Sequence, residues 1–344
     1  MIKINVLTDY RGWLFSSVEL YKQKHVVTMN LEKLKQYAQE AGIEFHFMKY
    51  SDLDIQRDYS NQFFIYNSSE DSGLIYKSYF EDLLYILKQK GAILIPEWRF
   101  MRAHHNKVMM ELLRSVDISG VDTGIQSRFY GCLEEFVSDI NNVVFPCVYK
   151  TAEGAGSNGV ALFKNKEQAL SFIKKNNINQ KPTLKQKVFT LKNNDKPAFH
   201  SNYRNKFVIQ NFIPGLSGDF KVLVFGDKYY ALSRQNRDND FRASGGGRLN
   251  YEPDLPEGIF DFAKSIYDVL NLPVLSLDIA HDGHRFYLIE FQCLHFGTAT
   301  LEYSTHYYSY IDDTWIRYNE SSILEKEYVN SLKRHIIKNY DCDE

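Results

Sequence analysis

A glycine-rich stretch at residues 154–159, Gly-Ala-Gly-Ser-Asn-Gly, closely follows a lysine at position 150. Glycine has no Cβ, so the backbone N–H groups of such a loop can approach phosphate oxygens. The ammonium group of Lys150, at the end of the preceding strand, would then contact a phosphate as well. The alternative is a plain flexible turn, and the neighbouring elements must decide between the two.

The element directly after the loop separates the kinds of phosphate-binding loop. Residues 160–163, Val-Ala-Leu-Phe, predict a strand, whereas a dinucleotide fold needs a helix directly after the glycines. A Walker A loop ends in Gly-Lys-Ser/Thr, and the chain contains no such sequence. A protein kinase has its lysine after the glycine loop and requires His-Arg-Asp, which is also absent. With these three kinds of loop excluded, the remaining arrangement is a strand that carries Lys150, a glycine loop and a second strand directly after the loop.

Two carboxylates, Asp278 and Glu290, lie on adjacent strands of a predicted hairpin that turns at Asp282-Gly283. Mg²⁺ binds in proteins through a few carboxylates together with substrate phosphates and water. The hairpin is therefore a candidate magnesium site. His104-His105 and Cys293-x-His295 lack the spacing of metal ligands, and we expect no zinc there.

The first hundred residues alternate between strand-like and helix-like segments. Strands are expected at residues 3–8, 43–48, 62–66 and 92–95, and helices at 31–41 and 74–90. Strands separated by helices of this length imply a parallel sheet. The sequence therefore predicts an α/β domain at the N-terminus.

The rest of the chain is richer in β-strands. Strands are expected at 143–150, 160–163, 207–213, 220–225, 229–233, 275–280 and 286–291, and helices at 106–114, 133–140, 167–175, 259–270 and 322–337. Gly226-Asp227 predicts a tight hairpin turn. Apolar residues of 259–270 recur at helical spacing: Ile259, Phe262, Ala263, Ile266, Val269 and Leu270. Residues 181–206 are polar and basic, typical of a solvated insertion or of a loop that covers an anionic substrate.

The composition excludes several classes of protein. Lys and Arg number 41 against 43 Asp and Glu, a net charge of -2, which argues against binding nucleic acid or an anionic membrane. The four cysteines lie far apart, so neither a zinc ribbon nor a disulfide framework is indicated. No signal-peptide pattern and no long apolar run occur. We expect a cytoplasmic protein, for which a homodimer is compatible with the sequence.

Further short motifs accompany the lysine and the glycine loop in a fixed order. They are residues 105–107, 145–150, 156–160, 208–215, 218–228, 233–234, 240–242, 278 and 289–292. Each is weak alone, but the ordered set resembles the ATP-grasp ligases, such as D-alanine–D-alanine ligase, glutathione synthetase and the glutamate ligase that modifies a ribosomal protein. The resemblance covers roughly residues 95–300.

The resemblance implies an α/β chain with the ATP-grasp fold. An N-terminal parallel α/β domain would cover residues 1–103. A small lobe with the glycine loop and the basic insertion would cover 104–206. A large lobe with the metal-binding hairpin and a C-terminal helix would cover 207–344. In such a fold, ATP is held between the sheets of the two lobes.

The resemblance also implies roles for individual residues. Lys107 and Lys150 would contact the ATP phosphates, and Arg234 and Arg242 would neutralise the γ-phosphate, with Lys150, Arg234 and Arg242 as the catalytic set. Asp219 would bind the ribose. The remaining nucleotide contacts would come from the loop and the hinge strand: Gly156, Ser157, Asn158, Gly159, Gln210, Asn211, Phe212 and Ile213.

Two positions depart from the pattern of these ligases. Asn211 stands where they usually have Glu, which keeps an acceptor for the adenine amine but loses the charge. Gln292 stands where they have Asn as a third metal ligand beside Asp278 and Glu290. Residues i and i+2 of a strand share a face, so Gln292 can still present its carbonyl with Glu290, one methylene farther out.

The implied reaction joins a carboxylate to an amine. ATP would phosphorylate the carboxylate, the amine would attack the acyl phosphate, and ADP and phosphate would leave. The cofactors would be ATP and two Mg²⁺ ions, with Mn²⁺ as an alternative metal, and the substrates small molecules or peptides. Two rivals remain open: a nucleotide-binding protein without ligase activity, and a phosphotransferase on the same fold.

Overall fold

The computed structural model describes residues 1–14, 16–19, 25–154, 159–178, 188, 201–237, 240, 242 and 248–340. The chain forms two compact units. The larger unit comprises Met1–His104, Leu113–Gly124 and Leu216–Glu344, and the smaller unit comprises His105–Leu112 and Ile125–Gly215.

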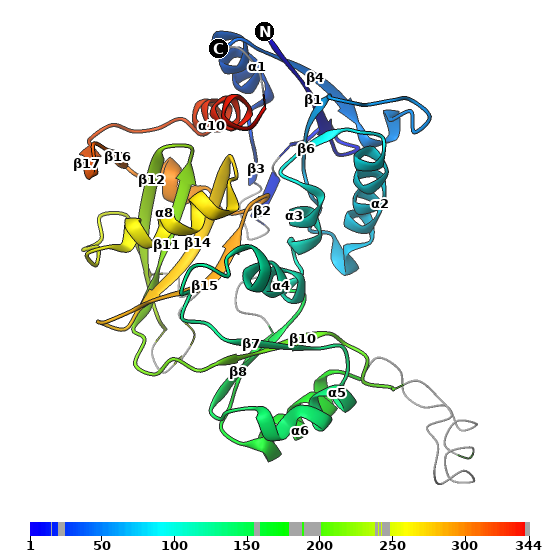
Figure 1. Cartoon of the computed structure of the whole chain (residues 1–344), viewed down its shortest axis with the longest axis vertical. Helices are drawn as coiled ribbons and strands as arrows, with labels where there is room; N and C mark the ends of the chain where they lie inside the picture. The colour runs from blue at the N-terminus through cyan, green and yellow to red at the C-terminus, as the bar shows by residue number, and fades with distance from the viewer. Residues whose placement is uncertain are drawn as a thin grey trace. The chain divides into compact units, whose positions relative to one another are not determined.

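The larger unit begins with a four-stranded parallel sheet, as the alternating pattern predicts. Its strands are β1 (Ile2–Thr8), β4 (Ile43–Lys49), β5 (Phe63–Tyr66) and β6 (Ile93–Ile95), in the order β4-β1-β5-β6. The helices of this region are α1 (Leu31–Glu40), α2 (Ile75–Gln89) and α3 (Trp98–Ala103), which Figure 1 shows around the sheet. A short hairpin of β2 (Ser16–Glu19) and β3 (His25–Thr28), which no sequence pattern predicted, precedes α1.

A seven-stranded sheet forms the other part of the larger unit. Its strands are β11 (Gly218–Phe225), β12 (Lys228–Gln235), β13 (Arg248–Asn250), β14 (Val274–His281), β15 (Phe286–Gln292), β16 (Tyr307–Ile311) and β17 (Thr314–Tyr318). The order is β15-β14-β11-β12-β16-β17, with β13 also paired to β12. Phe225 pairs with Lys228, so the predicted hairpin turn at Gly226-Asp227 is confirmed.

One hydrophobic core joins the two sheets of the larger unit. It contains Ile4 and Val6 of β1, Leu223 of β11 and Val329 of the last helix, α10 (Leu324–Asn339). Because these residues come from both ends of the chain, the N-terminal sheet and the seven-stranded sheet are parts of a single packed unit.

The helix α8 (Ile259–Leu270) has the predicted bounds but a slightly different buried face. Ile259, Ala263, Ile266 and Leu270 are buried, whereas Val269 is 47% exposed. Phe260 is buried instead, because its ring packs against Tyr308 and Trp315 of the β16–β17 hairpin. The expected position of Val269 on the buried face is therefore wrong.

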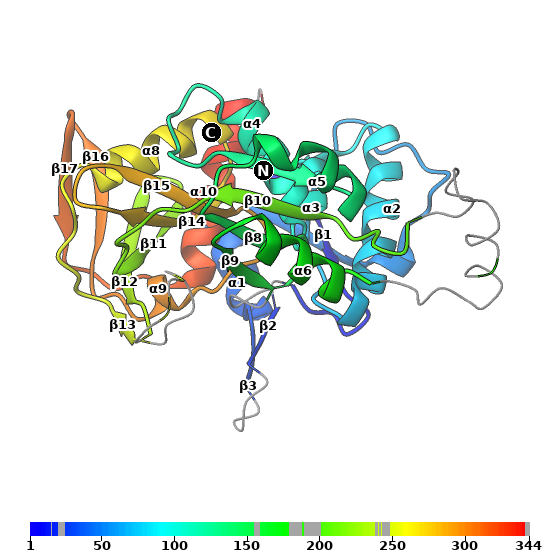
Figure 2. The same cartoon turned by 90° about the horizontal axis from the view of Figure 1, so that it is seen from below.

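The smaller unit is built on a four-stranded antiparallel sheet of order β7-β10-β8-β9. The elements are β7 (Ser127–Tyr130), β8 (Cys147–Thr151), β9 (Val160–Phe163), β10 (Phe207–Asn211), α5 (Leu133–Asp139) and α6 (Lys166–Asn176). The helices α5 and α6 lie side by side against this sheet (Figure 2). An aromatic core that includes Phe136, Tyr149, Phe163 and Phe207 fills the space between them.

The strand β10 pairs with β7 and β8 of the smaller unit. The expected boundary between residues 206 and 207 would separate β10 from those partners. The sequence predicts a strand over residues 207–213, close to the observed β10, but strand pairing is a long-range contact that the local pattern does not contain. Four further strands have no counterpart in the sequence prediction, because they are short or come from segments without clear alternation: β7, β13, β16 and β17.

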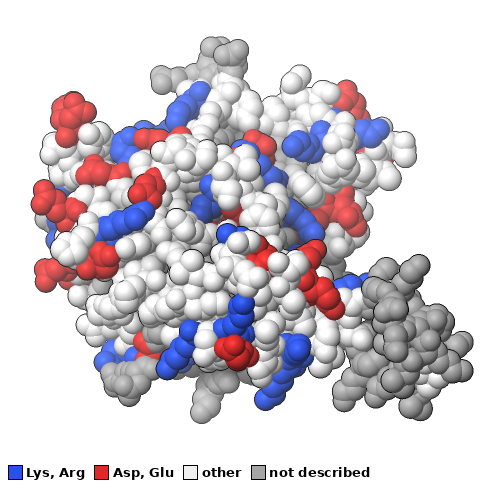
Figure 3. Space-filling model, turned by 60° about the horizontal axis from the view of Figure 1, so that its bottom comes forward, with Lys and Arg blue, Asp and Glu red and all other residues white. Residues whose placement is uncertain are grey.

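Charged side chains of both signs are interspersed on the face shown in Figure 3. Among the described residues, no helix is both long and apolar enough to cross a membrane.

Candidate functional site

A row of polar side chains occupies one face of the seven-stranded sheet. Asp219 of β11 pairs with Arg234 of β12, and Lys221 of β11 pairs with Asp278 of β14. In turn, Asp278 pairs with Glu290 of β15. Directly opposed residues of neighbouring strands point to the same face, and so do residues two apart on one strand. Pairing register therefore gathers these residues on one side of the sheet.

Arg234 is the centre of this polar face. Its Nε and Nη2 donate to the two oxygens of Asp219 at 2.8 and 2.5 Å, and Nη2 also lies 2.8 Å from Oδ2 of Asp278. The side chain of Arg234 is only 12% exposed. Burial works against the charged guanidinium, but the two carboxylates outweigh it and raise the pKa of Arg234. The cation is therefore held permanently charged and in a fixed orientation.

Asp278 is buried and faces two cations. Besides Arg234, Nζ of Lys221 lies 3.4 Å from its Oδ1. Burial disfavours the carboxylate, but Arg234 and Lys221 outweigh burial and lower the pKa of Asp278 to about 2. Asp278 is therefore ionised at neutral pH, as a metal ligand must be.

Glu290 and Gln292 are half-buried on the same face of β15, and Gln292 pairs with Ser276 of β14. With Asp278 they offer two carboxylates and one amide carbonyl on neighbouring strands. These are the hard oxygen donors that Mg²⁺ prefers, so the residues fit the ion that the sequence predicts.

Asp219, predicted to bind a ribose, is 1% exposed and has both carboxylate oxygens bonded to Arg234. Burial raises its pKa, while the adjacent guanidinium acts in the opposite direction. The structure thus places Asp219 as the partner of Arg234. Arg242 is placed against Asp240, two residues earlier, which it contacts through Nη2 at 2.6 Å and through its backbone N–H at 3.0 Å.

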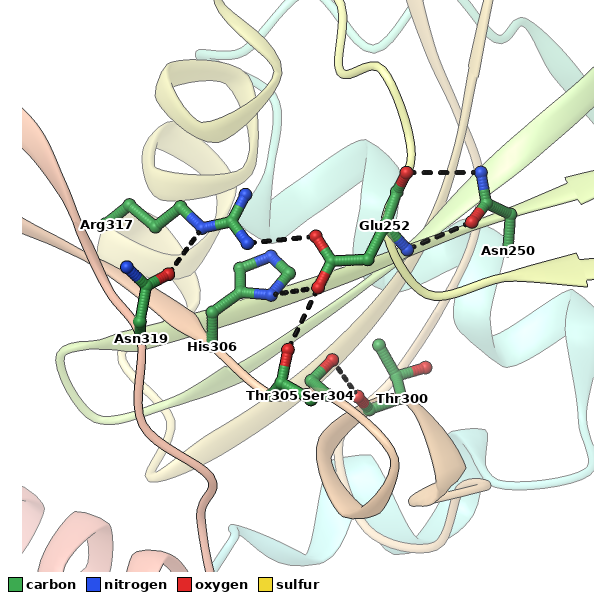
Figure 4. A network of polar contacts seen from close by, with 8 residues as sticks. All are labelled: Asn250, Glu252, Thr300, Ser304, Thr305, His306, Arg317 and Asn319. Carbon is green, nitrogen blue, oxygen red and sulfur yellow. Dashed lines mark hydrogen bonds and ion pairs between the residues drawn. The ribbon is translucent and has the colours of Figure 1, made fainter.

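A polar network anchors the chain that follows β13 (Figure 4). Glu252 accepts hydrogen bonds from Thr305 and Arg317, each at 2.9 Å, and its carboxylate lies 3.1 Å from Nδ1 of His306. Burial lowers the pKa of His306. Because β13 pairs with β12 opposite Arg234, this network helps to hold the strand that carries the central cation.

The smaller unit holds the two predicted ATP lysines. Lys107 begins α4 (Lys107–Asp117), where its backbone N–H donates to the carbonyl of Ala152 at 2.8 Å and its Nζ to the carbonyl of Gly154 at 2.6 Å. Lys150 lies on β8 and is 8% exposed. Both lysines thus lie at the start of the glycine loop. Lys150 precedes the loop in sequence, and Lys107 is hydrogen-bonded to Ala152 and Gly154.

Gly159 ends the glycine loop with a φ of +77°, a conformation that favours glycine. A Cβ at this position would overlap Oγ1 of Thr151. Gly156, Ser157 and Asn158, also predicted to bind phosphate, lie outside the described residues.

The predicted adenine-binding residues lie on and just after β10. The amide nitrogen of Gln210 donates to Oγ of Ser127 at 2.9 Å, and that hydroxyl donates to Glu111 at 2.6 Å. Oδ1 of Asn211 accepts a hydrogen bond from the backbone N–H of Gln126 at 2.7 Å. One acceptor position of Asn211 is therefore used within the smaller unit. Phe212 is half-buried and Ile213 is buried.

Sequence reasoning assigned no role to Lys221, although the structure places it beside Asp278. The signal was present in the alternation of β11, because Lys221 lies two residues after Asp219 and must share its face. No comparable local signal linked Asp219 to Arg234, whose contact depends on the register of two strands.

No protein-family model matches the chain, and no curated protein matches it by sequence. Solved structures do match. D-cycloserine synthetase DcsG is 12% identical, with a TM-score of 0.54, over 97% of this chain and 99% of that protein. The ATP-grasp ligase PsnB, complexed with minimal precursor, is 12% identical, with a TM-score of 0.51, over 97% and 99%. The ADP complex of N5-carboxyaminoimidazole ribonucleotide synthetase is 12% identical, with a TM-score of 0.51, over 89% and 73%. The predicted architecture is thereby confirmed, and the chain has the ATP-grasp fold.

Proposed function

We propose that the chain is an ATP-dependent ligase that joins a carboxylate to an amine through an acyl phosphate and releases ADP and phosphate. The polar face around Arg234 is the observation that carries this proposal. A buried, permanently charged guanidinium contacts the ionised Asp278, and Asp278 lies opposite Glu290 on the neighbouring strand, which also carries Gln292. Such a preorganised set of charges suits phosphoryl transfer, which depends mainly on positioning and charge neutralisation.

In this proposal Lys107 and Lys150 bind the ATP phosphates, and Arg234 neutralises the charge of the phosphoryl group in transfer. Asp278, Glu290 and Gln292 hold Mg²⁺, which when bound neutralises phosphate charge and orients the nucleotide. The peptide groups of Phe212 and Ile213, just after β10, bind the adenine edge in this proposal, because β10 itself is paired on both sides. The fold neighbours support this assignment, since one is named an ATP-grasp ligase and another was solved with ADP.

A nucleotide-binding protein without ligase activity is the second candidate. The contact between Oδ1 of Asn211 and the Gln126 N–H favours this candidate. The oxygen that was expected to accept a hydrogen bond from the adenine amine already accepts one within the protein. A phosphotransferase acting on a hydroxyl would use the same cations. All three functions share nucleotide binding. The ligase and the phosphotransferase differ in the acceptor required for ADP release, and the non-catalytic protein releases no ADP.

Two measurements test the proposal in sequence. First, millimolar Mg-ATP should raise the thermal stability of the full chain, by about 2.7 kcal/mol at a ligand concentration near 100 times Kd. Second, a matrix of carboxylates and primary amines, together with a set of hydroxyl compounds, is screened for ADP release. Release that needs both partners supports the ligase. Release that needs only a hydroxyl acceptor indicates a phosphotransferase, and nucleotide binding without any release supports the non-catalytic candidate.

A further inference from the structure

Glu70, His104 and His295 form a cluster in the larger unit. Glu70 follows β5, His104 follows α3, and His295 lies three residues after the end of β15. Nε2 of His295 is 3.7 Å from Oε1 of Glu70, and Nε2 of His104 is 4.0 Å from the same oxygen. Because Glu70 lies in the loop after β5 and the two histidines lie near it, the cluster is close to the carboxyl end of a parallel strand, the edge at which α/β sheets bind ligands.

Core packing explains why His295 reaches this edge. Leu294, its neighbour, is buried in the same hydrophobic cluster as Phe64 of β5, Leu94 of β6 and Met101 of α3. That contact brings the chain after β15 against the N-terminal sheet. The imidazoles of His104 and His295 are 2% and 4% exposed, whereas Glu70 is 44% exposed, so Glu70 is the solvent-facing side of the cluster.

The spacing of the three side chains suits a hydrogen-bond donor placed among them. Separations of 3.7 and 4.0 Å are too long for direct hydrogen bonds. A nitrogen about 2.8 Å from Glu70 Oε1 could also lie about 2.8 Å from either imidazole nitrogen. A primary ammonium group has three N–H donors, one for each of three such acceptors.

The loop that leads to Glu70 offers further polar atoms. Oδ1 of Asn67 and Oγ of Ser68 are buried and have no hydrogen-bond partner among the described residues. Nδ2 of Asn67 donates to the carbonyl of Trp13 at 3.3 Å, so the end without a partner is an acceptor. Buried polar atoms without partners are costly, and a bound polar ligand would relieve that cost.

We propose that this cluster binds the primary ammonium group of the amine substrate and that His295 removes its proton before the amine attacks. The inference rests on the proposed ligase function. An ammonium nitrogen has no lone pair, so it must lose a proton to become a nucleophile. Glu70 attracts the ammonium group and stabilises the imidazolium that forms on His295, as a carboxylate does beside a histidine base.

Protons and electron pairs balance in this step. The ammonium group gives one proton to His295 and becomes a neutral amine. The amine lone pair forms the C–N bond to the acyl carbon, and the C–O bond to the phosphate breaks, with its electron pair leaving on the phosphate. The second amine proton leaves with the phosphate, and His295 later returns its proton to solvent.

Hydroxylamine separates this role from a structural one, because it is largely unprotonated at neutral pH and traps acyl phosphates as hydroxamates without a base. The test compares wild type with His295→Asn, Glu70→Gln and the exposed control His284→Asn, using the most active pair from the carboxylate–amine screen. In His295→Asn we expect kcat for amide formation to fall about 10²–10⁴-fold, with hydroxamate formation nearly unchanged. Glu70→Gln should mainly raise KM for the amine, and the control should behave as wild type.

Four outcomes would overturn the inference. If amide and hydroxamate formation fall together in His295→Asn, the residue is structural, and if neither falls it has no role. If wild type releases no ADP with any pair, the ligase proposal itself has failed. Histidine and glutamate are also zinc ligands, so calorimetric titration of wild type with ZnCl₂ without nucleotide is the third arm. Stoichiometric Zn²⁺ binding that both variants lose would assign the cluster to a metal instead.

Discussion

The guanidinium of Arg234 donates to both carboxylate oxygens of Asp219, at 2.8 and 2.5 Å, inside the larger unit. The same guanidinium lies 2.8 Å from Asp278, so one cation is shared by two acids. Asp278 is thereby oriented from one side by Arg234, while Glu290 lies opposite it on the next strand. The proposed metal site thus depends on a buried ion pair that does not itself bind metal.

Asp219→Asn should destabilise the protein by about 3 kcal/mol, because removing one partner of a buried ion pair leaves the other incompletely compensated. Urea unfolding measures the change. The matched control is Asp227→Asn, which removes an exposed carboxylate paired with Arg334 at 2.7 Å and should cost less than about 1 kcal/mol. Equal losses in the two variants would contradict the central role of Arg234 and Asp219.

Under the proposed function, Lys150→Ala and Glu290→Ala should each reduce ADP release by about 10²–10³-fold, because the first removes a charge assigned to the ATP phosphates and the second a charge assigned to the metal. Steady-state kinetics with the active substrate pair measures the effect, and thermal unfolding checks that both variants fold. Lys164→Ala and Glu257→Ala alter exposed residues of the same types and units and should retain wild-type turnover. Near-normal release by either site variant would show that the site lies elsewhere.

The role of Gln292 is tested by two substitutions with opposite expectations. Gln292→Leu removes the carbonyl oxygen and should raise the Mg²⁺ concentration required for half-maximal turnover. Gln292→Asn keeps an amide oxygen on the same strand face and should keep or raise activity. A Mg²⁺ titration of turnover distinguishes them. An unchanged Mg²⁺ requirement in the Leu variant would leave Asp278 and Glu290 as the only protein ligands of this set.

Gly159→Ala should weaken both the fold of the smaller unit and its affinity for ATP. A Cβ there meets Thr151 and must also adopt a φ of +77°. Gly215→Ala is a matched control in the same unit, with a φ of +76° and nothing within 4 Å of the added Cβ. The control should cost about 1–2 kcal/mol from backbone strain alone, and Gly159→Ala more. Equal losses in urea unfolding would show that the contact with Thr151 is relieved without cost.

The stability of the chain should fall as the pH is lowered from about 6.5 to 4, in part through His335. Burial, helped by nearby Lys338, lowers the pKa of His335 to about 4, whereas an unfolded histidine titrates near 6.5. In this interval the unfolded chain binds a proton that the folded chain does not, so stability decreases by up to about 3 kcal/mol. His335→Gln should flatten the pH dependence of urea unfolding, and His46→Gln, at an exposed position, should leave it unchanged.

Local patterns in the sequence determined much of this protein. Alternating strands and helices predicted the parallel sheet of the first hundred residues, and helical spacing predicted the bounds of α8. The two-residue signal at Gly226-Asp227 predicted its turn. Lys150 before the glycine loop and Asp278 opposite Glu290 could also be found, because the relevant residues are close in sequence or lie on one hairpin.

Only the tertiary structure decided which distant segments meet. It paired β10 with β7 and β8, brought Arg234 between Asp219 and Asp278, and placed His295 beside Glu70. Periodicity reports which face of an element is buried, but not which partner covers it. Strand register and core packing supply that information: a shift of one residue in β12 would turn Arg234 to the other face of the sheet, and the burial of Leu294 beside Phe64 brings His295 to Glu70.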